Sequence, residues 1–386
     1  MNKKILIAHK YCGFIGGVEK YIFDTVSLLK KHGFSVYGIF EEELNQNSKQ
    51  FKSIFDKVFF VDIDNIKQTI AELKKDNFEH AFIHKLQNIE LFKMLQMNFL
   101  TTLFVHDHDY YCMRGHKYYS FCNKNCRRPF NTCICSICAR PFCRDNSGKI
   151  KFRSVRPFLR RKLFRVTRKC DSFVVLSEHM KNNLILNKYP LEKIKKIYPV
   201  ISVHYRKFQK GNKRELLYIG QLIRGKGVDI LLKALTYIKG DFKLNIVGKG
   251  NAENSINNLV SEYGMQDKVN MVGFTLDTEK WYKSASVIVV PSRWQEPFGL
   301  IGGEAYSYFK PVVGFNVGGI SEWLEDGVNG FLVTENDIKA FAGRIEYLLD
   351  NPLEAEKMGK IGNCMTKELF NEEVYLNEIQ HLLGEK

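Results

Sequence analysis

The strongest constraint on the fold is a regular alternation of short apolar runs and amphipathic segments in the second half of the chain. The runs have the length of buried strands, and the segments between them carry apolar residues at helical spacing. Strands that alternate with helices form parallel sheets, so we predict an α/β fold with a doubly wound, Rossmann-like sheet. The expected strands are residues 216–219, 243–247, 269–272, 287–290 and 311–315, and the expected helices are 229–238, 252–263, 278–284 and one that follows Phe298.

A less regular alternation occupies the first half. A chain of 386 residues is long enough for two domains with separate cores. We therefore predict two Rossmann-like domains that face each other across a cleft, residues 1–200 and 201–365, with the boundary between Pro199 and Gly211. The expected strands of the first domain are residues 4–8, 34–40, 81–84, 100–105 and 173–176, with the loop 9–17 and a helix after the first of them.

Two carboxylates, Glu296 and Glu304, lie eight positions apart around an expected helix start that contains glycine. Unpaired backbone N–H groups and the positive end of the dipole at a helix start suit a phosphate. A carboxylate accepts two hydrogen bonds at once, which suits the vicinal hydroxyls of a sugar. Ligands of doubly wound sheets bind at the carboxyl ends of strands, where this segment lies. The segment therefore points to a nucleotide-sugar in the cleft.

The residues around this segment carry a family resemblance. They include Pro291-Ser292, the run from Val317 to Glu322, and Asp326-Gly327. With the two glutamates they resemble the retaining glycosyltransferases of family 4, which have the GT-B fold and a paired-glutamate signature. The resemblance covers most of residues 214–350 and returns at several points of the first half. It implies that the donor binds mainly to the second domain and the acceptor to the first, and that a final helix, within 366–386, packs back on the first domain.

The resemblance also implies roles for individual residues. Glu304 matches the residue that holds the ribose, and Glu296 the residue that holds hydroxyls of the transferred sugar. Lys226 matches a lysine that clamps the diphosphate, whereas the family's arginine is replaced here by Gln221, which keeps a donor but loses the charge. Arg224 is a second candidate for that charge. The remaining donor-site positions are the double glycine Gly16 and Gly17 and the backbone N–H groups of Phe298, Gly299 and Leu300.

The sequence His106-Asp107-His108-Asp109 follows an expected strand and has two interpretations. Asp107 and Asp109 could form the D-x-D motif of metal-dependent glycosyltransferases. Alternatively, His106 matches the active-site histidine of the family-4 pattern. We favour the second interpretation because the second half already supplies a diphosphate site without a metal. The candidate catalytic residues are then His106, Lys226 and Glu296, and no cofactor is expected for catalysis.

Seven of the ten cysteines gather in a segment of about residues 110–145 that looks like an insertion. Two pairs of cysteines have the spacing of metal ligands. Three residues separate Cys122 from Cys126, and two separate Cys135 from Cys138. A structural zinc, an iron–sulfur cluster and a redox-labile set of thiols all remain open. The candidate ligands are Cys112, Cys122, Cys126, Cys133, Cys135, Cys138 and Cys143.

The net charge of +16 comes from the first half, where residues 1–199 hold 36 of the 58 Lys and Arg residues but only 18 of the 42 Asp and Glu residues. Residues 149–169 hold ten basic residues and no acidic one. The apolar residues among them favour an amphipathic segment on an anionic membrane surface, although a solvated helix face would give the same pattern.

We therefore expect a hexosyltransferase-type enzyme that moves a sugar from a nucleoside diphosphate sugar to a glycan or lipid-linked acceptor in cell-surface polysaccharide synthesis. The sequence has neither a run of the roughly 18 apolar residues that cross a bilayer nor a secretory signal, so a cytoplasmic protein on the cytoplasmic face of the membrane is expected. A nucleotide-sugar epimerase or phosphorylase of the same architecture is one alternative. A zinc-containing nucleic-acid-binding protein is another, but it leaves the second half unexplained, so no nucleic-acid partner is expected.

Overall fold

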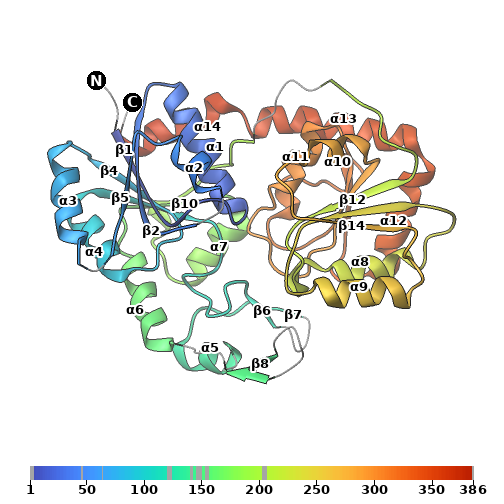
Figure 1. The fold of residues 1–386 in the computed structure, drawn as a ribbon, viewed down its shortest axis with the longest axis horizontal. Helices are drawn as coiled ribbons and strands as arrows, with labels where there is room; N and C mark the ends of the chain where they lie inside the picture. Colours follow the sequence, from blue (N-terminus) through green and yellow to red (C-terminus); the bar gives the residue numbers. More distant parts are fainter. Residues whose placement is uncertain are drawn as a thin grey trace.

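The computed structural model describes most of the chain as two α/β domains side by side, with the cysteine-rich segment below the first of them (Figure 1). Both domains are parallel sheets with helices on their faces, which confirms the predicted fold class. The described residues are 4–44, 47–62, 64–119, 124–139, 142–144, 150–152, 156–201 and 207–384.

The first domain is built on a seven-stranded sheet in the order β11-β10-β5-β4-β1-β2-β3. Its central strand is mostly apolar and buried, since Ile5, Leu6, Ile7 and Ala8 of β1 are all fully buried. The strands are β1 (Lys4–Cys12), β2 (Ser35–Glu43), β3 (Lys57–Phe60), β4 (His80–Ile83), β5 (Leu100–Val105), β10 (Ser172–Val175) and β11 (Ile194–Lys196), and the helices are α1 (Gly17–Lys31), α2 (Ser48–Lys52), α3 (Ile66–Lys75), α4 (Ile89–Asn98), α6 (Pro157–Thr167) and α7 (Glu178–Leu186).

One boundary differs from the prediction in a way that matters for the site. The first strand does not end at Ala8 but continues to Cys12, because it pairs with β2 as far as Cys12 and Glu43. The loop that precedes α1 is therefore shorter than predicted, and its glycines lie directly between the strand and the helix.

The second domain is built on a six-stranded parallel sheet in the order β14-β13-β12-β15-β16-β17. In both sheets the strand order reverses beside the first strand of the domain, which is where doubly wound sheets bind ligands. The strands are β12 (Glu215–Ile219), β13 (Lys243–Val247), β14 (Val269–Gly273), β15 (Val287–Val290), β16 (Val312–Phe315) and β17 (Gly330–Val333), and the helices are α8 (Val228–Leu235), α9 (Glu253–Glu262), α10 (Glu279–Ser284), α11 (Ile301–Ser307) and α12 (Ile338–Asp350).

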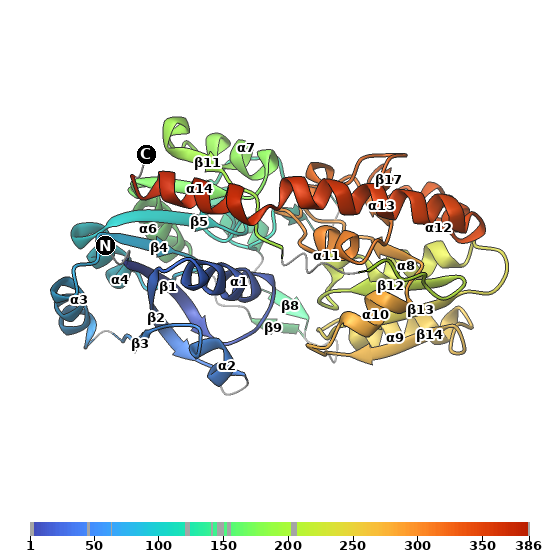
Figure 2. The same cartoon turned by 90° about the horizontal axis from the view of Figure 1, so that it is seen from above.

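Two helices at the C-terminal end of the chain run along one side of both domains (Figure 2). Helix α13 (Pro352–Leu369) packs on α11 of the second domain. Helix α14 (Glu372–Leu382) starts at a cap in which the Asn371 side chain accepts hydrogen bonds from backbone N–H groups. The Tyr375 hydroxyl on α14 lies 2.7 Å from that of Tyr21 and 3.1 Å from that of Thr25, both on α1. The end of the chain thus returns to the first domain.

The cysteine-rich segment contains short elements between β5 and α6. These are β6 (Tyr118–Tyr119), β7 (Lys124–Asn125), α5 (Thr132–Ala139), β8 (Phe142–Arg144) and β9 (Ile150–Phe152). The strands form two antiparallel pairs, β6 with β7 and β8 with β9. Helix α5 packs on α6, so the segment is attached to the first domain.

Candidate functional site

The loop after β12 places a lysine beside the first glutamate of the pair. A short 3₁₀ turn, Arg224–Lys226, leads into α8. At its end Gly227 has φ of +73°, and a side chain there would lie 1.9 Å from the carbonyl oxygen of Pro291. Only glycine allows this approach, which holds the loop after β12 against the loop after β15. As a result, Lys226 Nζ lies 2.7 Å from Glu296 Oε1.

The Glu296 carboxylate is buried and receives three donors on one oxygen. Besides Lys226, the Ser292 hydroxyl donates at 2.5 Å and the Trp294 indole N–H at 2.8 Å. Burial alone would raise the pKa of Glu296, but the charge of Lys226 and the three hydrogen bonds outweigh it and hold the pKa below its usual value. Glu296 is therefore ionised at neutral pH. Lys226 keeps a quarter of its side chain exposed, so it remains accessible from the cleft.

The second glutamate joins the two domains. On α11, Glu304 accepts a hydrogen bond from the Tyr282 hydroxyl at 2.7 Å and forms an ion pair with Lys20 of α1 at 2.5 Å. Asp24 lies in the same cluster. Burial raises its pKa to about 6; the charge of Lys20 opposes this rise, and the charge of Glu304 adds to it. The carboxylate that is predicted to hold the ribose thus forms an ion pair with a lysine of the first domain in this structure.

Backbone donors lie between the two glutamates, ahead of α11. Phe298 is fully buried, and its carbonyl accepts a hydrogen bond from the Trp323 indole at 2.7 Å, which fixes the backbone at this point. Within the described part of the chain, no group accepts a hydrogen bond from the N–H of Phe298, Gly299 or Leu300. These N–H groups remain available at the positive end of a short helix.

The glycine loop of the first domain faces these residues. A methyl group on Gly16 would lie 3.6 Å from the Gln221 amide nitrogen, and one on Gly17 would lie 3.6 Å from a methyl carbon of Leu300. The structure therefore brings together Gly16, Gly17, Gln221 and Leu300 across the two domains. Arg224 is exposed on the same loop as Lys226.

The predicted catalytic histidine, His106, belongs to a buried network in the first domain. Its Nε2 lies 2.7 Å from His84 Nδ1, and the two rings are stacked. Burial lowers the pKa of His106 to about 3, with smaller contributions from His9 and Lys85, so the ring is neutral at physiological pH. The network approaches the glycine loop through Glu19, whose carboxylate accepts hydrogen bonds from His9 and from the backbone N–H of Gly16.

The neighbouring residues of the same motif have different partners. Asp107 and Asp109 both form ion pairs with Lys85, at 2.6 and 2.9 Å, so a lysine already supplies the cation between the two carboxylates of the D-x-D interpretation. His108 reaches the second domain, since its Nε2 lies 3.2 Å from the carbonyl oxygen of Gln295. That contact is one residue away from Glu296.

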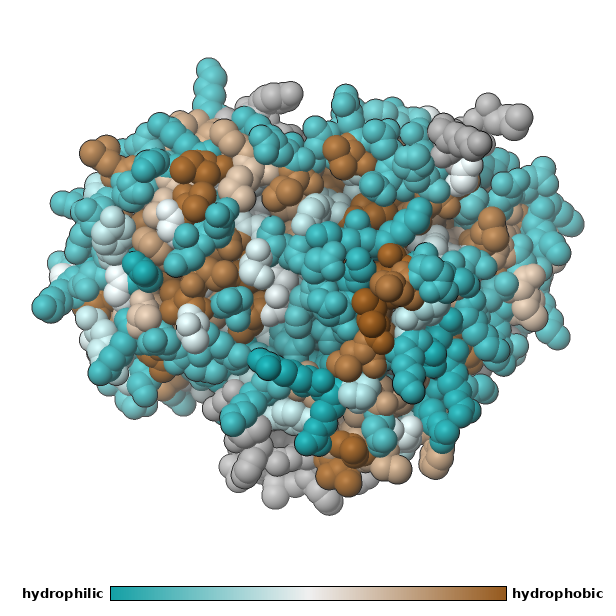
Figure 3. All heavy atoms as spheres, turned by 180° about the vertical axis from the view of Figure 1, so that it is seen from behind, coloured by the Kyte–Doolittle hydropathy of each residue, from teal (hydrophilic) through white to brown (hydrophobic). Residues whose placement is uncertain are grey.

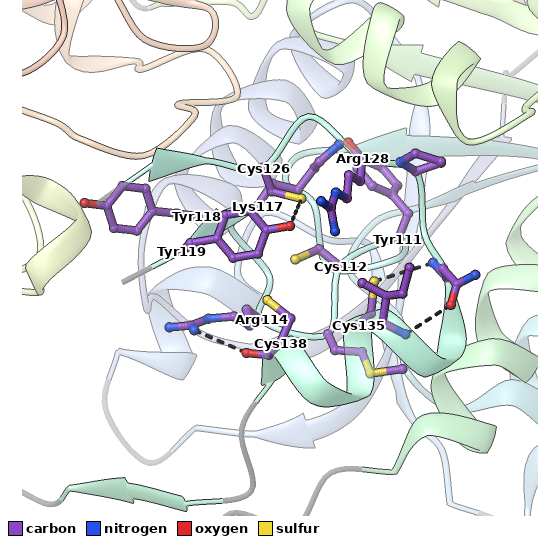
Figure 4. A pocket seen from close by; sticks show the side chains of 14 residues that line it. Tyr111, Cys112, Arg114, Lys117, Tyr118, Tyr119, Cys126, Arg128, Cys135 and Cys138 are labelled. Carbon is purple, nitrogen blue, oxygen red and sulfur yellow. Dashed lines mark hydrogen bonds between the residues drawn. The ribbon is translucent and has the colours of Figure 1, made fainter. Parts of the chain in front are cut away.

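Four of the seven predicted cysteines line one cavity in the cysteine-rich segment, whose volume is about 190 Å³ (Figure 4). They are Cys112, Cys126, Cys135 and Cys138. Burial raises the pKa of the Cys135 and Cys138 thiols, and the neighbouring thiols raise it further. Cys133 is exposed and does not line the cavity. Cys122 and the side chain of Cys143 lie outside the described residues.

The basic segment is described from residue 156 onward, so its beginning lies outside the described residues. Helix α6 buries Leu163 and Val166 in the core of the first domain, whereas Phe158 is 80% exposed. On the neighbouring α5, Ile137 is 78% exposed. Seen from behind, hydrophobic side chains lie at the lower end of the molecule, over the region of α5 (Figure 3). No described helix is long and apolar enough to cross a membrane.

Comparison with known protein families finds a match in the second domain. Residues 203–364 match the glycosyl transferases group 1. This part of the chain is a group 1 glycosyltransferase domain. All the second-domain residues predicted for the donor site, from Gln221 to Glu304, lie within it.

Several glycosyltransferases match part of the chain in sequence, and solved structures share its fold. An uncharacterized glycosyltransferase of Haemophilus influenzae is 32% identical over 188 residues, which are 47% of this chain and 53% of that protein. The capsular polysaccharide biosynthesis glycosyltransferase CapM of Staphylococcus aureus is 26% identical over 231 residues, 54% of this chain and 60% of that protein. The chain spans about half the length of the curated relatives it matches. The structure of HepE from Anabaena in complex with UDP-glucose shares the fold over 99% of both chains, with a TM-score of 0.75 and 15% identity.

Sequence reasoning missed several partners of the predicted residues in the group 1 domain. Ser292 and Trp294 both lie within four positions of Glu296, and their hydrogen-bonding side chains were a signal that could have been used. Lys20 follows Gly16 and Gly17 by one helical turn, so its place at the cleft was also foreseeable. Gln295 had no such signal, because its contacts join segments far apart in the chain.

Proposed function

We propose that the chain is a retaining, hexosyltransferase-type glycosyltransferase of family 4 that acts on a nucleoside diphosphate sugar without a metal ion at the diphosphate. The observation that carries this proposal is the buried Lys226–Glu296 pair in the group 1 domain, opposite the Gly16–Gly17 loop of the first domain. A cation, a fixed carboxylate and free backbone donors in one cleft are what a sugar diphosphate requires.

In the proposed mechanism, Lys226 and the N–H groups of Phe298, Gly299 and Leu300 stabilise the charge that develops on the departing diphosphate. When Lys226 turns to the phosphates, Glu296 keeps the hydrogen bonds from Ser292 and Trp294 and therefore remains ionised. It can then accept hydrogen bonds from hydroxyls of the transferred sugar. Gln221 and Arg224 lie on the same loop and complete the donor side.

Glu304 takes the ribose in this proposal. The Tyr282 hydroxyl holds one carboxylate oxygen, and the other is paired with Lys20, whose side chain is half exposed. An exposed ion pair is worth little, about 1 kcal/mol or less, so ribose hydroxyls can replace Lys20 at a small cost.

The resemblance to family 4 supports retention of the anomeric configuration. We infer attack on the same face as the leaving group, with the departing phosphate taking the proton of the acceptor hydroxyl. His106 contributes hydrogen bonding and not charge, since its pKa of about 3 keeps the ring neutral.

The relatives support the choice of substrate class. HepE was solved with UDP-glucose, and CapM is named for capsular polysaccharide biosynthesis. We therefore infer a nucleoside diphosphate sugar as donor and a glycan or lipid-linked acceptor in cell-surface polysaccharide synthesis.

We further infer that the protein works at the cytoplasmic face of the membrane. The exposed Phe158 and Ile137 lie on adjoining helices, and Arg161, Lys162 and Arg165 of α6 are exposed beside them. Apolar side chains flanked by cations suit an anionic lipid surface, where each basic residue contributes about 1 kcal/mol. Sedimentation with vesicles that contain phosphatidylserine tests this. Binding should weaken in the Phe158→Ser variant, and equal binding to neutral and anionic vesicles would contradict it.

The test of the enzymatic proposal is a panel of nucleoside diphosphate sugars, scored by release of the nucleoside diphosphate in the presence of EDTA. At least one donor should be turned over by the wild-type chain and by none of the Lys226→Ala, Glu296→Ala and Glu304→Ala variants. A matched control is Lys268→Ala on the far edge of the second domain, which should retain activity. Equal turnover by the wild type and all three cleft variants would overturn the proposal.

A further inference from the structure

The cavity of the cysteine-rich segment is built by three separate parts of the chain. Cys112 follows β5, Cys126 follows β7, and Cys135 and Cys138 lie one turn apart on α5. Figure 4 shows the four sulfur atoms turned toward the same space. Four thiols from three segments thus line one cavity, which is an arrangement typical of a ligand set.

The size of the cavity argues against a single ion. Zinc–sulfur bonds are about 2.3 Å long, so four thiolates around one zinc lie roughly 3.8 Å from one another and leave no room between them. Here the four thiols line a cavity of about 190 Å³ together with other side chains. Across the described residues, no three Cys, His, Asp or Glu side chains come close enough to hold one metal ion. A cavity of this volume has room for a group larger than one ion.

The surroundings of the cavity suit an anionic, sulfur-ligated group. Arg114, Lys117 and Arg128 line it, and they offset the negative charge that four thiolates bring. Two donors reach the sulfur atoms directly. The backbone N–H of Asn131 lies 3.5 Å from Cys135 Sγ, and the Tyr119 hydroxyl lies 3.1 Å from Cys126 Sγ. Hydrogen bonds to ligating sulfur are among the contacts that tune iron–sulfur clusters.

We propose that Cys112, Cys126, Cys135 and Cys138 hold an iron–sulfur cluster. Four cysteine thiolates are the usual ligand set of such clusters, and the two-residue spacing of Cys135 and Cys138 recurs in them. Cys133 lies on the same helix but outside the cavity, so it takes no part.

The cluster has a consequence for the donor site, and this part rests on the proposed function. The carbonyl oxygens of Lys117 and Cys126 accept hydrogen bonds from the Gln295 amide at 3.0 and 2.8 Å. Gln295 immediately precedes Glu296. A cluster bonded to Cys126 fixes these carbonyls and, through Gln295, the backbone that carries Glu296. Gln295 is therefore a positioning residue.

The first test measures metal content alone. The full chain is purified without oxygen from cells grown with added iron, or reconstituted with ferrous iron and sulfide, and assayed for iron, acid-labile sulfide, zinc and visible absorption. Iron and sulfide should be present in equal molar amounts, with a broad charge-transfer band in the visible range. Cys126→Ser and Cys138→Ser should lose most of both, whereas Cys133→Ser should retain them. Stoichiometric zinc without iron, a chain with neither metal, or equal loss in Cys133→Ser would overturn the proposal.

The second test separates the cluster from the donor site. Gln295→Leu should retain iron and sulfide but lower kcat/KM about tenfold, because the cluster forms while the backbone at Glu296 is released. Iron in the wild type together with unchanged kcat/KM in Gln295→Leu would overturn the positioning role. Iron in a chain that turns over no donor would leave the cluster standing and overturn the proposed function instead.

Discussion

Replacing Lys226 by methionine removes the cation from the Glu296 carboxylate while keeping most of the side-chain volume. Breaking a buried ion pair costs about 3–5 kcal/mol because one charge is left buried without its partner. Here the loss should be smaller, since Ser292 and Trp294 still donate to Glu296 and Lys226 is a quarter exposed. We therefore expect a loss of about 2 kcal/mol in the free energy of unfolding near pH 7.5.

The pH dependence of the unfolding free energy shows whether the loss comes from the charge of Lys226. In the wild type the pKa of Glu296 is depressed, so its contribution to stability is present above the unfolded pKa and is lost as the pH falls through the folded pKa. Without Lys226, the hydrogen bonds from Ser292 and Trp294 remain but the lowering of the pKa by its charge is lost, so less stability is lost as the pH falls. The difference between wild type and variant should therefore be largest near neutral pH and shrink toward about pH 4.

Urea unfolding followed by tryptophan fluorescence can measure this difference. All three tryptophans lie in the second domain, at 281, 294 and 323, so the signal reports the domain that carries the pair. The double variant Lys226→Met with Glu296→Gln is the matched control, because it leaves no buried charge, and it should recover most of the loss. The loss of unfolding free energy could instead be equal near neutral pH and near pH 4, or the double variant could fail to recover it. Either result would show that the pair does not act through charge.

Three further predictions concern the rest of the cleft. His106→Gln should reduce the loss of stability between about pH 6.5 and 4, because a histidine whose folded pKa is about 3 costs up to about 1.4 kcal/mol per pH unit there; identical acid unfolding curves would contradict this. Lys20→Ala should change the unfolding free energy by less than about 1 kcal/mol yet tighten binding of a nucleoside diphosphate in calorimetric titration, because ribose no longer displaces an ion pair; weaker binding would show that Lys20 assists the donor. Gln221→Arg should tighten the same binding about tenfold and make it more sensitive to salt, because a charged fork replaces a neutral amide; no change in either would place the diphosphate elsewhere.

Periodicity was sufficient to predict the architecture. The runs at 216–219 and 287–290 are strands of the second sheet, because fully buried parallel strands need uninterrupted apolar side chains. The ends of the strands were harder to predict from the sequence. The extension of β1 to Cys12 depends on pairing with residues as far as Glu43, and pairing across the chain leaves no local signal.

For the candidate site, too, some features could be predicted from the sequence and others could not. Lys226 and Glu296 lie in one domain, and both could be proposed for the donor site from the resemblance to family 4, although their ion pair could not. Contacts that depend on how the domains meet could not, and these include the Lys20–Glu304 ion pair and the bonds from Gln295 to the cysteine-rich segment. For the cysteines, spacing showed which thiols were candidates, but only the fold separates Cys135 and Cys138 from Cys133.

The most direct measurement is a crystal structure of the chain soaked with a donor that it turns over, in the presence of a chelator. We predict the diphosphate in the interdomain cleft, within hydrogen-bond distance of Lys226 Nζ and of the backbone nitrogens of Gly299 and Leu300, with the sugar hydroxyls on Glu296. A diphosphate held through a divalent cation on Asp107 and Asp109, or one bound outside the cleft, would contradict it.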